Sequence, residues 1–454
     1  MTEKTLHPTS HPEQTLLVIG AGPKAISLAA KRFVLSSLGF SVPQLRILDA
    51  KGLVASWSGA HGFTDGEQLL GTRPEKDIGF PYGSTCWDHD ATRKSLAREM
   101  LRFSWQSYLV QQGLYAPWID RGRTRPTHGE WASYLTWVAE QVNIPLLQTR
   151  VMAISQTPDE QRWQLTCQNN AGEVQTIEGD GLVLTGPGRP TLLPGQPLSH
   201  PRVYDGETFW SSNEEMLRFS RTSENPVHVG VVGTGETAAA IVVSLLHTLK
   251  NRVFIEVISP NGMLYSRDEG FEENRLFSDP DASFARLNGL HEHSLNWLRM
   301  TETDRRAFLR RTDRGVFSLQ TMEEVNRSEN VRTMMGTARS MLPLEEQVIL
   351  DIAYDTTIEQ DRYDYVVVAT GFDPLWFSDL MDEASQQKYF FREGKMPDRT
   401  SIERTIERDL SVQSLSPRLH LPMLAGTSQG PGFPNLSCLG LLSDRILASY
   451  HHKE

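Results

Sequence analysis

The chain has 454 residues, of which 39% are hydrophobic, and a formal net charge of −11. A chain of this length exceeds one compact core, so we expect two or three folding units. The acidic balance argues against a nucleic-acid groove or an anionic membrane surface as the main partner, because both require basic patches. Small molecules are the partners that this composition favours.

The three cysteines, Cys86, Cys167 and Cys438, are far apart and include no C-x-x-C pair. This pattern favours a reducing compartment and argues against a disulfide reductase or a zinc site. The polar N-terminal residues 1–15 lack the apolar segment of a signal peptide, and no apolar run approaches membrane-spanning length. We therefore expect a cytoplasmic protein without membrane association and without a bound metal.

The first predicted element is a buried strand, TLLVIG, that leads into a glycine-rich turn and a helix. In the pattern G-x-G-x-x-A, Gly20 makes the tight turn, Gly22 admits a diphosphate, and Ala25 lets the helix pack on the strand. Pro23 lies at the helix start, where its missing N–H donor is harmless. The next strand, LRILDA, ends in Asp49, which is placed to accept hydrogen bonds from ribose hydroxyls. This order predicts a nucleotide site, the alternative being a glycine turn without a ligand.

Two features further along the chain have a structural interpretation. An aromatic stripe recurs at helical spacing and is more typical of core than of a ligand platform: Trp105, Tyr108, Trp131, Tyr134 and Trp137. His291 and His293 have no cysteine or carboxylate cluster to complete a metal site. We expect the aromatic side chains in the core and the two histidines in a loop or on a helix surface.

A second turn of the same kind follows the strand VHVGVVG. Gly233 and Gly235 form the turn, and Ala238 is the small residue that packs the helix on the strand. The following strand, VFIEVIS, ends in Ser259 and Pro260 rather than in an acid. An acid there would repel a 2′-phosphate, so its absence favours NADPH over NADH.

The candidate contacts to this second nucleotide are Gly233, Thr234, Gly235, Glu236, Thr237 and Arg267. Arg267 or Arg275 would supply the positive charge that a 2′-phosphate requires. The alternative for both is a solvated loop arginine.

Two nucleotide sites in one chain are typical of an FAD enzyme that a pyridine nucleotide reduces. GLVLTGPGRP at 181–190 and YDYVVVATGFDP at 363–374 are further strands that end in turns. Such strand ends mark the crossings between domains in flavoproteins that bind two dinucleotides. The fold class that we predict is therefore α/β with two Rossmann-like dinucleotide-binding domains.

The domain boundaries follow from these crossings. We expect an FAD-binding domain from 1–205 and 376–454, interrupted by an NADPH-binding domain at 206–375. The helical, charged residues at about 262–340 would form a small substrate-capping insertion.

Several stretches lie outside the nucleotide fingerprints: DGEQLLGTRPEKDIGFPY, RFSWQSYL, GFEENRLFSDP, RRTDRGVFS, ATGFDPLWF and TSQGPGFPNLSCLGLLSDR. Through them the chain resembles the FAD- and NADPH-dependent N-hydroxylating monooxygenases of siderophore biosynthesis, most closely the lysine N-hydroxylases of mycobactin assembly. The resemblance spans residues 16–448. Much of that family has a His-Gly-Leu step where this chain has Leu439, Gly440 and Leu441, so no role of that histidine is carried over.

The resemblance implies the reaction. NADPH would reduce FAD, oxygen would add to give the C4a-hydroperoxyflavin, and the neutral primary amine of the substrate would attack the distal oxygen. Since the amine is itself the nucleophile, the protein must orient it and exclude water rather than supply an acid–base pair. We accordingly assign no catalytic side chain.

The resemblance also implies contacts to the substrate. Lys76 has the position of a lysine that pairs with the carboxylate of an amino-acid substrate, the alternative being a surface lysine paired with Glu75 or Asp77. Asn274 matches an asparagine that binds the substrate's amino-acid end.

Two more substrate contacts are implied with open alternatives. Asp313 falls where the family usually has asparagine, and a salt bridge with Arg311 or Arg314 is the other interpretation. Ser443 matches a serine at the amino-acid head of the substrate, with helix capping as the competitor.

The FAD-binding set that motif and resemblance together predict is Gly20, Gly22, Pro23, Ala25, Asp49, Trp57, Gly371 and Gly440. The function that we expect is N-hydroxylation of the side-chain amine of L-lysine for a hydroxamate siderophore, by a homo-oligomer. Other primary amines remain alternatives: ornithine, cadaverine or putrescine, and histamine. A ketone or sulfide monooxygenase with FAD would share both fingerprints without requiring Lys76 and Asn274.

Overall fold

The structure is a computed structural model that describes residues 14–60, 64–83, 86–87, 90–266, 270–281, 296–312, 316–390, 398–413 and 415–451. Five residues named above lie outside these ranges: Arg267, His291, His293, Asp313 and Arg314. Within the described residues, no helix has both the length and the apolar character that a membrane crossing requires.

The first sheet has seven strands in the order β17-β6-β1-β2-β3-β4-β5. Its strands are β1 (Thr15–Ile19), β2 (Gln44–Asp49), β3 (Leu146–Gln156), β4 (Trp163–Asn169), β5 (Val174–Gly179), β6 (Gly181–Leu184) and β17 (Arg418–His420). Strand β1 pairs in parallel with β2 and β6, and β2 pairs in parallel with β3, whereas the pairs β3–β4 and β4–β5 are antiparallel. The C-terminal strand β17 thus joins the N-terminal part of the chain in one sheet.

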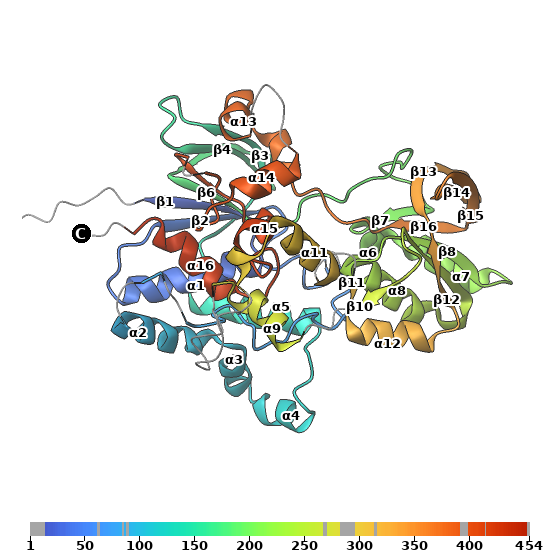
Figure 1. The fold of residues 1–454 in the computed structure, drawn as a ribbon, viewed down its shortest axis with the longest axis horizontal. Helices are drawn as coiled ribbons and strands as arrows, with labels where there is room; N and C mark the ends of the chain where they lie inside the picture. The colour runs from blue at the N-terminus through green and yellow to red at the C-terminus, as the bar shows by residue number, and fades with distance from the viewer. Residues whose placement is uncertain are drawn as a thin grey trace, which may run out of the picture.

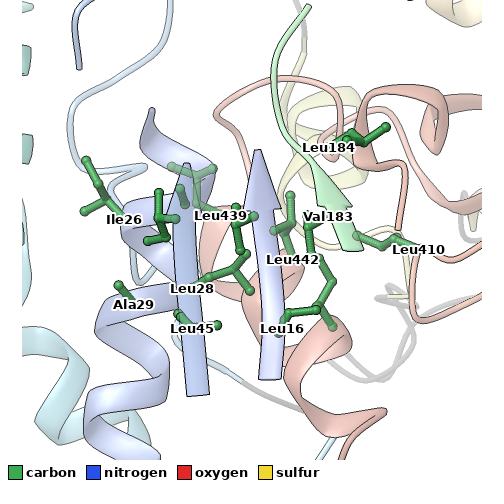
Figure 2. Packing of buried hydrophobic residues seen from close by; sticks show 14 of the residues in the cluster. Leu16, Ile26, Leu28, Ala29, Leu45, Val183, Leu184, Leu410, Leu439 and Leu442 are labelled. Carbon is green, nitrogen blue, oxygen red and sulfur yellow. The ribbon is translucent and has the colours of Figure 1, made fainter. Parts of the chain in front are cut away.

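Helices from both ends of the chain cover one face of this sheet (Figure 1). They include α1 (Pro23–Ser37), α5 (His128–Gln141) and α16 (Leu439–Ala448). Leu28 of α1 and Leu442 of α16 pack with Leu16 and Val183 of the sheet in one buried cluster (Figure 2). Leu16, Leu17 and Val18 of β1 are all fully buried, so both faces of the strand are covered. This explains why β1 is a continuous apolar run rather than an alternating one.

The aromatic stripe lies in this core, as predicted. Trp105, Trp131, Tyr134 and Trp137 are buried, and Tyr108 is partly buried against them. They come from α3 (Trp105–Gln111) and from α5. The other elements of this part are α2 (Asp90–Met100), η1 (Leu101–Phe103), α4 (Tyr115–Asp120), η4 (Trp376–Leu380), α13 (Glu383–Tyr389), α14 (Arg399–Thr405), η5 (Pro422–Leu424) and α15 (Gly426–Gln429).

The second sheet has five parallel strands in the order β12-β9-β8-β16-β7. Its strands are β7 (Val203–Asp205), β8 (Val227–Val232), β9 (Val253–Ser259), β12 (Val331–Met335) and β16 (Tyr365–Val368). One face packs on α8 (Glu236–Leu249), and the other packs on an antiparallel sheet of β13 (Thr337–Pro343), β14 (Val348–Tyr354) and β15 (Thr357–Tyr363). The remaining elements nearby are α6 (Thr208–Ser212), α7 (Glu214–Thr222), η2 (Lys250–Arg252), β10 (Tyr265–Ser266), β11 (Val316–Phe317) and α12 (Leu319–Arg327).

The residues expected as a capping insertion divide between the two units. The helices α9 (Phe271–Ser278), η3 (Trp297–Arg299) and α11 (Glu302–Thr312) share a small apolar cluster. The Trp297 indole N–H donates to the Thr427 carbonyl of α15 at 3.1 Å, so these helices dock on the C-terminal part of the first unit. By contrast, α12 lies against α8, and β12 is a strand of the second sheet (Figure 1).

Candidate active site

The turn between β1 and α1 forms an open cradle at a helix N-terminus. Gly20 has φ +102°, and a Cβ there would lie 2.3 Å from the Thr185 hydroxyl oxygen, so only glycine suits this position. A Cβ at Gly22 would meet nothing within 4 Å. Because Gly22 directly precedes the N–H groups of α1, the empty space beside it suits a diphosphate.

Two linked cavities meet at this cradle. They measure about 560 Å³ and about 360 Å³ and share lining residues, among them Gly20, Asp49 and Gly186. The larger one extends to Trp376, and the smaller one extends to Trp57. A dinucleotide is long and carries its diphosphate in the middle, so the residues present fit FAD.

Asp49 has a role that the sequence motif does not show. Its Oδ1 accepts the N–H groups of Lys51 and Gly52 at 2.8 and 2.9 Å, and its Oδ2 accepts that of Ala21 at 2.9 Å. These bonds join the turn after β2 to the turn after β1. A carboxylate has about four acceptor positions, so one remains for the predicted ribose hydroxyl.

The other predicted FAD contacts differ in where they lie. Trp57 lines the smaller cavity, with its ring 4.9 Å from that of His128. Burial holds the pKa of His128 down at about 4. Gly371, with φ +100°, lies after β16, and its carbonyl accepts the Thr191 N–H at 3.0 Å. Among the described residues that line the two cavities, Trp57 is present and Gly371 is not.

Gly440 lies at the start of α16, pressed against another backbone segment. A Cβ there would lie 2.1 Å from the Gly79 carbonyl oxygen, and its N–H donates to the Phe80 carbonyl at 2.8 Å. The glycine therefore lets α16 approach the loop that follows Lys76. FAD contact by Gly371 and by Gly440 stays a prediction.

The second glycine turn repeats the geometry of the first. Gly233 has φ +125°, and a Cβ there would lie 2.3 Å from the Ala369 carbonyl oxygen, while a Cβ at Gly235 would meet nothing within 4 Å. Gly235 is the N-cap residue of α8. The residues present thus fit a second diphosphate at a helix N-terminus.

The two residues after this turn lie close to a loop of the first unit and to the residue that follows β7. Glu236 Oε1 lies 3.5 Å from where a Cβ of Gly71 would be, and Thr237 packs on Gly206. Glu236 therefore brings the predicted NADPH turn close to the segment that carries Lys76.

Arg275, the alternative to Arg267 as the source of positive charge, lies on α9 and pairs with Asp279 at 3.8 Å.

Lys76 and Asn274 meet although 198 residues separate them. The Lys76 ammonium donates to Asn274 Oδ1 at 3.3 Å, and it also lies 5.9 Å from the centre of the Phe80 ring. Lys76 comes from the loop before α2, and Asn274 comes from α9. The two residues that the resemblance assigned to one end of the substrate are thus brought together.

Ser443 lies elsewhere, in the interface between α1 and α16. Its side chain is fully buried, its hydroxyl donates to the Gly440 carbonyl at 3.0 Å, and its oxygen lies 3.2 Å from that of Ser27. It caps no helix end, since it lies inside α16. Its contact with substrate stays a prediction, as does that of Asp313.

Asp77 supports the loop of Lys76, a role that its place in the sequence, where it is only a possible partner of that lysine, did not predict. Its carboxylate accepts the Trp105 N–H at 3.0 Å, the Gly79 N–H at 3.1 Å and the Tyr82 hydroxyl at 2.7 Å. Burial raises the pKa of Asp77 to about 6, against the opposing effect of these hydrogen bonds. A charged residue directly before the apolar Ile78 was the available signal.

Comparison with known proteins agrees with this geometry. The two sheets and their glycine turns define the class of protein as a flavoprotein with a second dinucleotide site. Residues 95–374 match the family described as L-lysine 6-monooxygenase/L-ornithine 5-monooxygenase. The chain belongs to this family. It is an NADPH-dependent flavin monooxygenase with FAD and NADPH as cofactors, which confirms the predicted fold class, family and cofactors.

Similar proteins cover nearly the whole chain. L-lysine N6-monooxygenase MbtG of Mycolicibacterium paratuberculosis is 38% identical over 444 residues, which are 96% of this chain and 95% of that protein. MbtG of Mycobacterium tuberculosis H37Rv is 38% identical over 442 residues, covering 96% and 94%. Among solved structures, the lysine monooxygenase NbtG of Nocardia farcinica has a TM-score of 0.77 at 38% identity and covers 95% of this chain and 98% of that one.

A more distant solved structure shares the fold alone. The ornithine N-hydroxylase KtzI of Kutzneria sp. 744 has a TM-score of 0.72 at 17% identity and covers 96% of this chain and 99% of that one.

Proposed function

We propose that this enzyme hydroxylates the side-chain amine of L-lysine, with NADPH and O₂, for assembly of a hydroxamate siderophore. The observation that carries the proposal is the 3.3 Å contact between the Lys76 ammonium and Asn274 Oδ1. The relatives MbtG and NbtG, each 38% identical over nearly their whole length, are a lysine N6-monooxygenase and a lysine monooxygenase.

Lys76 and Asn274 together suit an amino-acid end group. An ammonium forms a charge-assisted hydrogen bond with a carboxylate. The Asn274 amide offers both a donor and an acceptor, so it can orient the carboxylate and the neighbouring α-amine. A diamine or histamine has no carboxylate, and the second, positively charged amine of a diamine would also be repelled by Lys76.

The protein's own contribution is positioning. With FAD bound and reduced by NADPH, O₂ supplies one oxygen atom to the amine and the other leaves as water. Lys76 and Asn274 hold the amino-acid end, so the side-chain amine extends away from them as a neutral nucleophile. Orientation and exclusion of water then govern the yield of hydroxylamine, and no side chain has to serve as the nucleophile.

We also propose which part of the chain binds each cofactor. Residues 1–205 and 376–454 would bind FAD and residues 206–375 would bind NADPH. The strands support this division, because those of the first sheet all lie in the former ranges and those of the second sheet, apart from β7, lie in the latter. In this proposal the enzyme works in the cytoplasm as a homo-oligomer, and light scattering of the purified holoenzyme tests the oligomer.

A panel of amines tests the proposed function. Reduced enzyme is incubated with O₂ and L-lysine, L-ornithine, cadaverine or histamine, and hydroxylamine is assayed. We expect L-lysine to give the highest kcat/KM. Preferential turnover of cadaverine or histamine would replace L-lysine by another amine, and no hydroxylamine from any amine would favour a ketone or sulfide monooxygenase.

A further inference from the structure

Asn274 lies on α9, a helix of only 8 residues, so its place depends on what holds that helix. The last turn of α9 abuts a glycine-containing loop of the C-terminal segment. A Cβ at Gly432 would lie 2.0 Å from the Phe277 carbonyl oxygen, and a Cβ at Gly430 would lie 2.6 Å from Pro280 Cγ. These glycines bring the loop's backbone into direct contact with the end of α9.

Just after α9 in the sequence, Asp281 forms an ion pair with Arg445. Arg445 Nη2 of α16 donates to Asp281 Oδ2 at 3.0 Å, and the Arg445 side chain is only 1% exposed. Its Nη1 donates to Gln429 Oε1 at 3.3 Å, and its guanidinium lies 4.5 Å from the centre of the Phe433 ring. Arg408 also reaches Asp281 Oδ2, at 2.7 Å, but its side chain is 56% exposed.

The two arginines therefore differ in what they contribute. A buried guanidinium that loses its carboxylate is left as an uncompensated charge, which is strongly unfavourable. The ion pair with the exposed Arg408 contributes less, because water solvates its guanidinium. The Arg445–Asp281 pair, rather than the Arg408–Asp281 pair, thus fixes the segment after α9.

The same helix that carries Arg445 also supports the loop of Lys76. Near its N-terminus, the Gly440 N–H donates to the Phe80 carbonyl at 2.8 Å. Ser27 of α1 links the two segments further, because its hydroxyl lies within hydrogen-bond distance of the Ile78 carbonyl, at 2.7 Å, and of the Leu439 carbonyl, at 2.9 Å. One end of α16 therefore holds the Lys76 loop, and the other end holds the α9 segment.

We propose that Asp281 and Arg445 are a positioning pair that aligns Asn274 with Lys76 through α16. The pair sets the recognition of the amino-acid end of the substrate without touching it. This inference rests on the proposed function, in which Lys76 and Asn274 bind that end.

The first test is Asp281→Asn, which removes the charge and keeps the shape. We expect the KM for L-lysine to rise about tenfold, because a displaced Asn274 would lose one hydrogen bond to the substrate. The KM for NADPH should be unchanged. Arg408→Gln is the matched control, because it removes the exposed partner of the same carboxylate, and its KM for L-lysine should equal that of wild type.

A double-mutant cycle separates positioning from a general structural role. If Asp281 acts through Asn274, Asn274→Ala combined with Asp281→Asn should raise the KM for L-lysine no further than Asn274→Ala alone. Multiplication of the two single effects would overturn the inference. If Asp281→Asn fails to fold or to hold FAD, Arg445→Lys takes its place in the same cycle, because it keeps the charge and loses the planar fork.

Failure of the inference and failure of the proposed function give different results. Wild type that forms no hydroxylamine from L-lysine overturns the proposed function. Wild type that turns over L-lysine, with Asn274→Ala impaired but Asp281→Asn at the wild-type KM, overturns only the positioning pair.

Discussion

Lys31 and Asp444 form an ion pair in which Nζ lies 2.8 Å from Oδ1 and both side chains are almost wholly buried. The pair joins α1 to α16, and the Trp87 indole N–H donates to the same carboxylate oxygen at 3.3 Å. Segments near the two ends of the chain are therefore joined through this buried pair.

This pair predicts a large effect on stability. Lys31→Met leaves the Asp444 carboxylate buried without its cation, which should cost about 3–5 kcal/mol. The expected result is a clearly lower midpoint of thermal unfolding. Replacing both partners, by Lys31→Met with Asp444→Leu, should recover part of the loss, and equal midpoints for the single and double variants would contradict this account.

The open space beside Gly22 predicts the result of filling it. Gly22→Val should clash with the FAD diphosphate, so the purified variant should be colourless while wild type is yellow. Gly83→Val is a matched control, because a Cβ there also meets nothing within 4 Å and Gly83 is not among the described residues lining the cavities. A yellow, fully loaded Gly22→Val protein would remove the assignment of this turn to FAD.

The second turn predicts a defect in electron supply alone. Gly235→Val fills the equivalent space before α8, so FAD should stay bound while its anaerobic reduction by NADPH becomes slower. Bleaching by dithionite, followed at the flavin absorbance, should be unaffected. If NADPH reduces this variant at the wild-type rate, the nucleotide binds elsewhere.

The Lys76–Asn274 contact predicts the effect of removing the ammonium. A charge-assisted hydrogen bond contributes about 1.5–3 kcal/mol, so Lys76→Ala should raise the KM for L-lysine roughly tenfold to hundredfold. Lys388→Ala is the control, since that lysine pairs with Glu160 at 3.1 Å near the surface. Steady-state kinetics with L-lysine and cadaverine decide the matter, because an unchanged KM for L-lysine would show that the carboxylate binds elsewhere.

The chemistry of the amine predicts a pH dependence. Only the unprotonated amine is a nucleophile, and a lysine side chain has a pKa of about 10.4 in water. At pH values below that pKa, the neutral fraction of the amine therefore grows about tenfold for each unit by which the pH rises. Hydroxylamine formed per NADPH consumed should rise from mildly acidic to mildly alkaline buffer, with hydrogen peroxide accounting for the remainder. Flat coupling over this range would mean that another group deprotonates the amine.

Patterns confined to a few neighbouring residues predicted the two nucleotide turns. At Gly20 and Gly233, a positive φ and a close contact with the residue after the neighbouring strand exclude every side chain. Glycine at these positions therefore indicates the turn. The apolar strands before them were recognised for the same local reason, because a strand covered on both faces has no polar alternation. The aromatic core between 105 and 137 followed from helical spacing.

The candidate substrate site could not be predicted from local pattern. Lys76 and Asn274 were named by resemblance alone, since nothing in either neighbourhood indicates the other. Ser443 was expected at the substrate, and the packing of α16 on α1 buries its hydroxyl beside Ser27. Asp49 was expected at a ribose, and it also binds the backbone of both turns.

The sequence by itself determined where the chain turns and which segments are buried, because backbone geometry and apolar period are properties of adjacent residues. Only the tertiary structure decided which charged residues meet. Asp281 and Arg445 are 164 positions apart, and each has many possible partners of opposite charge in the sequence. The tertiary structure brings Asp281, which follows α9, to the buried Arg445 of α16, because a buried charge is stable only where the fold supplies its counter-charge.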